Sequence, residues 1–304
     1  MSCFLPKIYE SRAAASRHGN SERVGCMKYR FLRFPGFRTK ALTASFDDGT
    51  VYDRQLVAIF NRYGIKGTFN IPGFCYEYGP EKENVLSKEE LRSLYWPNGH
   101  EVAIHGYQHQ ALINSVPIDG IREVLEGRMV LERFYGKIIR GMAYPDRTAT
   151  NETIESYLKM LNVVYARAAG KESGSFSLPE DWLCWMPTCK HTDGRLMEYA
   201  DKFLQENPAG RYCAARDPIL FFFWGHSFEC VDRWNIIEDL CKKVGGRDDI
   251  WYATNMELYE YVSAYRSLIF SADNTLVCNP TQIRVSFDED YKLYTVGPGE
   301  TLVL

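Results

Sequence analysis

The sequence has no excess of basic residues and no long apolar stretch. Its 36 Lys and Arg stand against 39 Asp and Glu, giving a formal net charge of -3, unlike the basic surface of nucleic-acid-binding domains. No apolar run approaches the roughly 20 residues that cross a bilayer. CFLP near the start is followed at once by KIYESR, which is unlike a signal-peptide core. We therefore expect no nucleic-acid partner and no membrane insertion.

The nine cysteines include no CxxC pair. An odd number without paired spacing is unlike the disulfide framework of a small secreted protein. Thiols stay reduced in the cytosol, so we predict a cytoplasmic protein whose cysteines mostly act as small apolar side chains.

Three regions differ in pattern. Residues 1–26 are polar and arginine-bearing without periodicity, which predicts a disordered extension; a transit-like segment or a true start at Met27 are the alternatives. Residues 27–266 form the main domain. Residues 267–304 lack a helical period and show short β-prone runs broken by turn sequences, which predicts a small antiparallel β appendage.

From about residue 40, short apolar runs such as KALTASF, KGTFNI and PILFFFWGH alternate with longer helical patterns. Gly64, Gly136 and Gly245 each stand where a left-handed helix C-cap is expected. Such α/β alternation indicates a parallel sheet, either a (β/α) barrel or a doubly wound open sheet. In both folds, functional residues lie at the carboxyl ends of the strands.

Three of these strand ends carry residues suited to chemistry. SFDDG places Asp47 and Asp48 side by side, where a metal ion would offset their charge, although a plain turn also fits. His105 and His109 follow the run HEVAI at a spacing that suits a metal-binding pair. His226 ends the run LFFFWGH and, taken alone, is more typical of a structural histidine near the core.

Together these segments resemble the motifs of the NodB-type polysaccharide deacetylases, carbohydrate esterase family four. SFDDG resembles their TFDDG signature, HGYQH their H-[ST]-x-x-H metal motif and WGH their late L-x-H motif, while GMAYP stands where they carry an Arg- and Pro-rich motif. The resemblance covers about residues 38–265. It implies an α/β fold, a distorted (β/α) barrel of about seven strands.

The resemblance also implies a role for each matching residue. Asp48, His105 and His109 would hold one divalent metal ion. Zinc is the first candidate, and cobalt, nickel, iron or manganese are the alternatives. Asp47 would be the general base and His226 the general acid. The implied reaction is removal of an acetyl group from an N-acetylated or O-acetylated carbohydrate by metal-activated water. The sequence is also compatible with a homo-oligomer.

Two departures from the family pattern concern the surroundings of these residues. Gly106 replaces the Ser or Thr after the first metal histidine, and Ala143 replaces an arginine that steadies the base. We expect Arg147 to reach back and replace that arginine, with Arg140 as the other candidate. The further candidates for substrate binding or support are Tyr144, Pro145, Arg147 and a pair resembling the family's D-W motif, Asp181 and Trp182.

Two other functions remain as alternatives. One is an allantoinase-like hydrolase of a small cyclic amide, which the departures from the polysaccharide motifs allow. The other is a carbohydrate-binding pseudoenzyme that uses the β appendage as its contact surface. A measurement of bound metal distinguishes the pseudoenzyme from the two enzymes, because a binding module need not retain a divalent ion. Comparison of activity on acetylated sugars with activity on cyclic ureides distinguishes the two enzymes from each other.

Overall fold

The barrel is built from eight parallel strands. The computed structural model describes residues 28–75, 84–146, 150–170, 172–212 and 215–304, and the statements below concern those residues. The barrel strands are β2 (Lys40–Asp47), β3 (Gly67–Ile71), β4 (Glu101–Ile104), β5 (Gly141–Ala143), β6 (Tyr165–Arg167), β7 (Cys189–Lys190), β8 (Ile219–His226) and β9 (Ile250–Tyr252).

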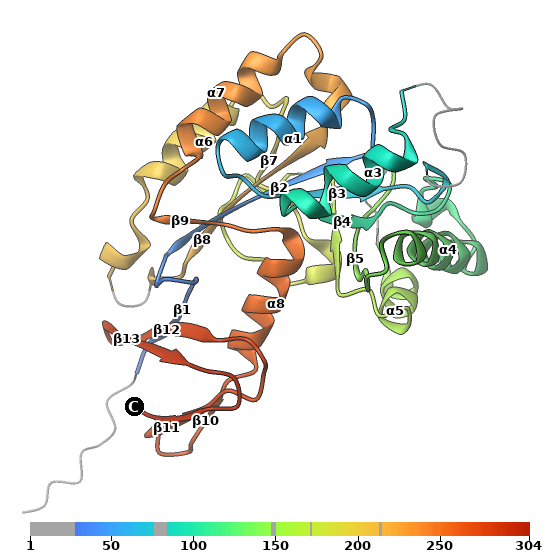
Figure 1. Ribbon diagram of the computed structural model, residues 1–304. Helices are drawn as coiled ribbons and strands as arrows, with labels where there is room; N and C mark the ends of the chain where they lie inside the picture. The colour runs from blue at the N-terminus through green and yellow to red at the C-terminus, as the bar shows by residue number, and fades with distance from the viewer. Residues whose placement is uncertain (1–27, 76–83, 147–149, 171, 213–214) are drawn as a thin grey trace, which may run out of the picture.

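The strand order makes a curled sheet with nearly closed edges. Seven strands follow the path β6-β5-β4-β3-β2-β8-β7, and β9 pairs with the first residues of β2. Trp185 forms a parallel bridge to Arg167 of β6 shortly before β7 pairs with β8. The chain between β6 and β7 therefore links the two edges of the sheet, and the predicted distorted barrel is confirmed (Figure 1).

Helices cover the outside of the barrel (Figure 1). Two of the three predicted left-handed glycines are found, because Gly64 and Gly136 have φ values of 67° and 64°. At the third position the prediction is wrong by one residue: Gly245 has φ -81° and Gly246 takes the positive φ of 65°. The helices are α1 (Asp53–Arg62), α3 (Lys88–Leu94), α4 (Pro117–Tyr135), α5 (Glu152–Met160), α6 (Leu196–Gln205), α7 (Trp234–Val244) and α8 (Asn255–Arg266).

The two faces of the central strand β2 differ toward its carboxyl end, where the outward face is apolar and the inward face carries polar side chains. Leu42, Ala44 and Phe46 belong to the large apolar cluster that includes the buried faces of the outer helices. Since successive strand side chains point to opposite faces, Ser45 and Asp47 point into the barrel, and both are buried. The carboxylate at the end of β2 is thus directed inward by strand periodicity alone.

A small antiparallel unit follows α8, at the bottom of Figure 1. One of its sheets has the order β10-β11-β14 and the other β1-β12-β13, so a strand that precedes the barrel in sequence completes the second sheet. The antiparallel appendage predicted from the sequence is confirmed. Its strands are β1 (Arg30–Arg33), β10 (Ile269–Phe270), β11 (Leu276–Cys278), β12 (Val285–Glu289), β13 (Lys292–Val296) and β14 (Thr301–Val303).

A buried charge cluster joins this unit to the barrel. Arg216, just before β8, donates two hydrogen bonds to the Asp288 carboxylate on β12, at 2.9 and 2.6 Å. The guanidinium of Arg33 on β1 lies 3.4 Å from the same carboxylate. All three side chains are almost fully buried. One carboxylate therefore compensates two buried arginines.

None of the described helices is long and apolar enough to cross a membrane.

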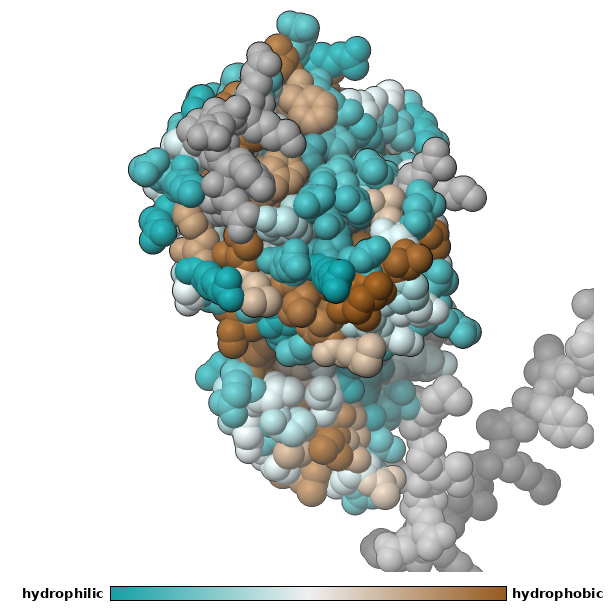
Figure 2. All heavy atoms as spheres, turned by 90° about the vertical axis from the view of Figure 1, so that its right-hand side faces the viewer, coloured by the Kyte–Doolittle hydropathy of each residue, from teal (hydrophilic) through white to brown (hydrophobic). Residues whose placement is uncertain are grey.

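Figure 2 looks onto the side of the molecule that carries α4 and α5, and shows a mostly hydrophilic surface crossed by an apolar band. Exposed apolar side chains on these helices and the connection after α4 include Ile118, Ile138 and Met160. Apolar atoms make up over half of an ordinary protein surface, so scattered residues of this kind need no partner.

Replacement of the shared carboxylate tests the cluster. Asp288→Ala leaves two buried guanidinium groups without a counter-charge, so we expect the free energy of unfolding to fall by about 3–5 kcal/mol. Urea denaturation measures the change. Asp239→Ala, at an exposed position of α7, is the control and should stay within about 0.5 kcal/mol of the parent. Equal stability of the two variants would contradict the assignment.

Candidate active site

Strand register brings the predicted catalytic residues together. In the parallel pairing of β2 with its neighbours, Asp47 lies opposite Asn70 of β3 on one side and His226 of β8 on the other. His105 follows β4, and Arg167 ends β6. Side chains from five strands therefore meet at the carboxyl edge of the barrel, where the α/β fold places a site.

Asp47, His105, Arg167 and His226 line one cavity of about 190 Å³. Every ligand and catalytic residue predicted from the sequence is among the lining residues, as is Tyr144. Pro145 is buried beside Tyr144 in the sequence. The full lining is Asp47, Asp48, His105, His109, Tyr144, Asp146, Arg167, Ala169, Trp224 and His226.

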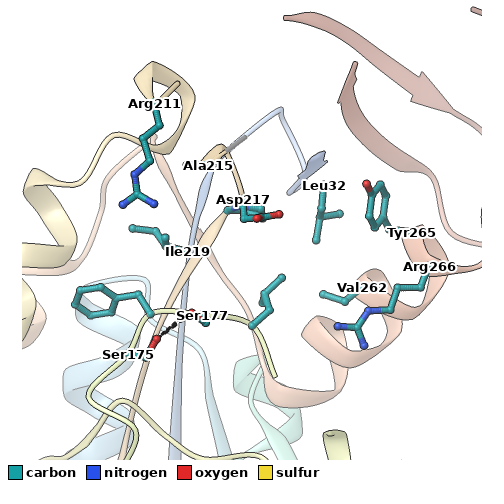
Figure 3. Close-up of a pocket in the computed structure, with 13 residues that line it drawn as sticks. Leu32, Ser175, Ser177, Arg211, Ala215, Asp217, Ile219, Val262, Tyr265 and Arg266 are labelled. Carbon is teal, nitrogen blue, oxygen red and sulfur yellow. Dashed lines mark hydrogen bonds between the residues drawn. The ribbon is translucent and has the colours of Figure 1, made fainter. Parts of the chain in front are cut away.

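A larger cavity of about 710 Å³ lies elsewhere. Ile219, the first residue of β8, lines it, whereas His226 is the last residue of the same strand. Figure 3 shows this cavity between the start of β8 and α8, with Arg211, Asp217 and Arg266 on its walls. It contains none of the predicted catalytic residues and lies at the opposite end of the barrel.

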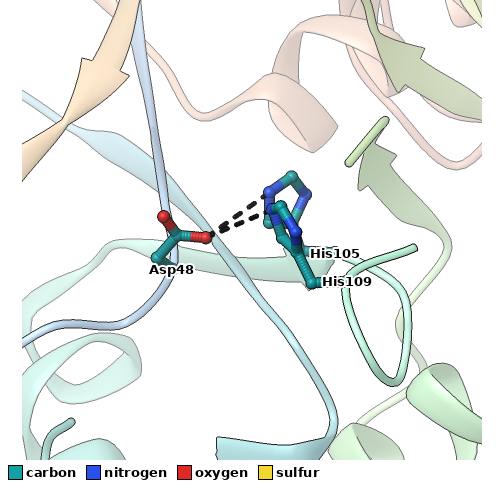
Figure 4. A group of neighbouring side chains, drawn as sticks. All are labelled: Asp48, His105 and His109. Carbon is teal, nitrogen blue, oxygen red and sulfur yellow. Dashed lines mark ion pairs between the residues drawn. The ribbon is translucent and has the colours of Figure 1, made fainter. Parts of the chain in front are cut away.

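Three side chains form a candidate metal centre (Figure 4). One ligand atom from each of Asp48, His105 and His109 can be chosen so that all lie within 4.8 Å of one another. The Asp48 carboxylate is 3.7 Å from Nε2 of His105 and 3.5 Å from Nε2 of His109. One carboxylate and two imidazoles suit a divalent ion and leave coordination positions open.

The outer partners of the histidines favour ligation through Nε2. Nδ1 of His105 lies 3.0 Å from the Ala143 carbonyl oxygen. Because a carbonyl only accepts, Nδ1 carries the proton and the Nε2 lone pair faces the cluster. Burial lowers the pKa of His105 despite the nearby carboxylates, which favours the neutral form that a ligand requires. Nδ1 of His109 lies 3.8 Å from the Asp146 carboxylate.

The loop between the two histidines is held by a carboxylate from α4. Glu123 accepts hydrogen bonds from the backbone N–H groups of Gln108 and Gln110, at 2.8 and 2.9 Å. Gly106 has φ 72°, and a Cβ there would lie 2.4 Å from a carboxylate oxygen of Glu123. Glu123 therefore fills the space of a Ser or Thr side chain, and the support of the loop is rerouted to α4.

Asp47 is fixed as a buried, ionised carboxylate. Arg167 donates from Nη2 to one oxygen at 2.5 Å, and Asn70 donates from Nδ2 to the other at 2.8 Å. Burial alone would raise the pKa of Asp47, but the charge of Arg167, aided by His105 and His226, outweighs it and lowers the pKa. Asp47 is thus charged and locked in one orientation.

Arg167 is the supporting arginine that the sequence predictions missed. The predicted substitute, Arg147, lies outside the described residues. The guanidinium of Arg140 lies 3.7 Å from Glu260 and does not line the cavity. Arg167 ends the apolar run NVVYAR, so its position at a strand end was the available signal. What pointed away from it was the family pattern, which places the arginine one strand earlier, at Ala143.

His226 faces the two aspartates from the other side. Its Nε2 lies 3.8 Å from the carboxylates of both Asp47 and Asp48, and its Nδ1 lies 3.2 Å from Glu229. Burial alone would lower the pKa of His226, but the Glu229 hydrogen bond and the two aspartates outweigh it and raise the pKa. The imidazole is therefore oriented and favoured in its protonated form.

Glu229 is a second supporting residue that the sequence did not assign to this role. Besides His226, it accepts from Nζ of Lys190 at 2.6 Å and lies 3.1 Å from Nε2 of His191. Burial would raise its pKa, but these three partners hold the pKa far below its usual range. Glu229 therefore stays negatively charged behind His226.

The structure does not bring Asp181 and Trp182 to the cavity. Asp181 accepts from the backbone N–H of Leu183 at 2.8 Å and caps a short 3-10 turn. Trp182 packs against Trp185 and Tyr259, with ring centroids 4.7 and 5.3 Å apart. Their D-W sequence thus serves a local turn and an aromatic cluster.

The candidate metal centre predicts a specific loss on mutation. His105→Ala should lower metal affinity by more than the roughly 10- to 100-fold that loss of an outer partner costs. Elemental analysis after loading with zinc and dialysis measures this. His100→Ala is the control, because His100 is also buried but precedes β4, at its opposite end. Parent-like metal content in His105→Ala would exclude this ligand set.

Part of the barrel matches a known protein family. Residues 36–166 match the family model described as polysaccharide deacetylase. That range contains both aspartates and both metal-centre histidines, and it ends one residue before Arg167. No match to a curated protein was found.

Several solved structures share the fold at low sequence identity. A Pseudomonas aeruginosa PAO1 structure assigned as a polysaccharide deacetylase has TM-score 0.57 and 14% identity over 75% of this chain and 92% of that one. A Mycobacterium smegmatis structure with the same assignment has TM-score 0.53 and 19% identity over 77% and 94%. The allantoinase Puue has TM-score 0.55 and 11% identity over 75% and 91%. Residues 36–166 are thus similar to the polysaccharide deacetylase family, and the chain shares its barrel fold with these solved structures.

Proposed function

We propose that the chain is a metal-dependent hydrolase that removes acetyl groups from an N-acetylated or O-acetylated carbohydrate. One observation carries the proposal: the Asp47 carboxylate, whose pKa is lowered, and Nε2 of His226, whose pKa is raised, lie 3.8 Å apart beside the Asp48–His105–His109 cluster. A base and an acid with oppositely shifted pKa values are the arrangement that acyl transfer to water needs.

Asp48, His105 and His109 would hold the Lewis acid of the reaction. A divalent ion held by Asp48, His105 and His109 would polarise the acyl carbonyl and lower the pKa of a water molecule. We propose zinc, because two imidazoles, one carboxylate and open positions are a usual catalytic zinc set.

The protein's own groups then move the protons. Asp47 accepts a proton from the attacking water, and Arg167 and Asn70 keep its carboxylate aimed at that water. His226 donates a proton to the leaving nitrogen or oxygen, while Glu229 stabilises the positive charge on the imidazole. The presence of ligands, base, acid and their supports argues against a pseudoenzyme.

The decisive experiment is a hydrolysis screen of the zinc-loaded protein. Its substrates are N-acetylglucosamine oligomers, acetyl-xylan and cyclic ureides, and acetate and ammonia release are both measured. We expect acetate from an acetylated sugar. Ammonia or ring opening from the ureides alone would favour the cyclic-amide alternative, and no product from any substrate would contradict the proposal.

Asp47→Asn tests the base within the same assay. The amide keeps the shape of the side chain but cannot accept the water proton, so turnover should fall by about 100- to 10,000-fold. Metal content should stay near that of the parent, because Asp47 is not assigned as a ligand. Turnover within a few-fold of the parent would mean that another group is the base.

Arg167→Ala tests the support of the base. Without the guanidinium, Asp47 loses the hydrogen bond that fixes its orientation, and we expect turnover to fall on the order of 100-fold. Arg167→Lys should recover part of this loss because it restores the charge but not the planar donor. Arg140→Ala is the matched control. Parent-like turnover in Arg167→Ala would show that Asn70 alone orients the base.

We also propose a cytoplasmic location. Cys184, Cys189, Cys230, Cys241 and Cys278 are free thiols, which suits a reducing compartment. Cell fractionation tests the location, and recovery of the protein from the culture medium would contradict it.

A further inference from the structure

Two aromatic rings contact the imidazole of His226. Trp224, nearly buried, lines the cavity, and its ring centroid is 5.7 Å from that of His226. Phe228 is closer, at 5.0 Å with an interplanar angle of 36°. Unlike Trp224, Phe228 is 42% exposed and belongs to none of the apolar clusters formed by the described residues. The ring is thus presented to solvent beside the proposed acid.

A fixed turn holds Phe228 in this position. It is the second residue of a 3-10 turn, Ser227–Cys230, that directly follows β8. The Ser227 hydroxyl hydrogen-bonds with that of Thr50 at 2.9 Å. Glu229 of the same turn is anchored to His226, and Cys230 is fully buried. The ring is therefore exposed on a constrained backbone, and its position relative to His226 is set before any ligand arrives.

The proposed reaction determines which part of the substrate lies near this ring. His226 protonates the leaving atom, and in a deacetylation the leaving atom belongs to the sugar. The sugar must therefore lie on the His226 side of the cavity, while the acetyl group lies over the metal centre. Phe228 contacts the His226 ring and thus lies next to that side of the cavity, although it is not part of the cavity lining.

A pyranose matches the surface that Phe228 offers. One face of the sugar ring presents C–H groups, whereas its edge presents hydroxyl groups. An exposed aromatic face can cover the C–H groups, and polar side chains beside it can bind the edge. Lys190 and Glu229, each about three-quarters buried, and Asp48 lie around His226.

We propose that Phe228 is a stacking platform for the sugar ring that carries the acetyl group, or for its neighbour in an oligosaccharide. This inference rests on the proposed function and adds the position of the sugar within the site. The competing explanation is that Phe228 only shields the imidazole of His226. Shielding would affect every substrate equally, whereas a platform affects sugars selectively.

Kinetics on two substrates separate these explanations. For Phe228→Ala, kcat/KM on the trimer of N-acetylglucosamine should fall about tenfold relative to kcat/KM on vinyl acetate, which has no ring to stack, mainly through KM. Phe228→Tyr should restore most of the loss because it keeps the aromatic face. Phe37→Ala is the matched control: Phe37 is 39% exposed but lies in the turn before β2, at the other end of the barrel. Equal losses on both substrates would overturn the platform.

A direct binding measurement tests the platform independently of the proposed hydrolytic function. Isothermal titration of the trimer into zinc-loaded Asp47→Asn protein, with and without Phe228→Ala, measures affinity without turnover. We expect about tenfold weaker binding without the ring. If the parent releases no acetate but binds the trimer in a Phe228-dependent way, the platform stands and the proposed function fails. If the trimer binds equally well without the ring, or does not bind at all, the platform is excluded.

Discussion

The buried ion pair between Asp47 and Arg167 is the constraint on which the site depends. An ionised carboxylate inside a barrel is costly unless a hydrogen-bonded cation accompanies it. Arg167 is that cation, and it comes from β6, four strands away from β2 along the sheet. The pair can form only if the sheet curls far enough to face its own edge. Barrel closure and ionisation of Asp47 are therefore one structural requirement.

The division between the two faces of each strand explains how one element serves both stability and chemistry. On β8, Phe221 and Phe223 pack in the cluster below the outer helices, while Trp224 and His226 line the cavity. The outer face can change its apolar side chains with only packing consequences. On the inner face, a change alters the electrostatic balance that lowers the pKa of Asp47 and raises the pKa of His226.

The sequence was sufficient for the fold class and for the residues whose motifs are local. Asp47 and Asp48 are adjacent, and His105 and His109 are four apart. Each pair alone also fitted a structural role, and their joint resemblance to the deacetylase motifs suggested the shared chemistry. Arg167 and Glu229 could not be assigned in this way, because their partners are distant in sequence or become partners only through a turn geometry. The pairing of β1 with β12 was likewise not visible, since more than 240 residues separate the two strands. Asp181 and Trp182 are the opposite case, because this dipeptide resembles a family motif but lies in a local turn and an aromatic cluster away from the cavity.

That long-range pairing has a consequence for how the chain acquires its structure. Residues 30–33 leave the ribosome early, but their partner strand follows only after the entire barrel has been synthesised. Until then Arg33 lacks the Asp288 carboxylate that neutralises it in the folded protein. Contacts between segments so far apart form late and slow the final folding step. The β1–β12 pair and its buried charges can therefore form only after residues 285–289 have been synthesised.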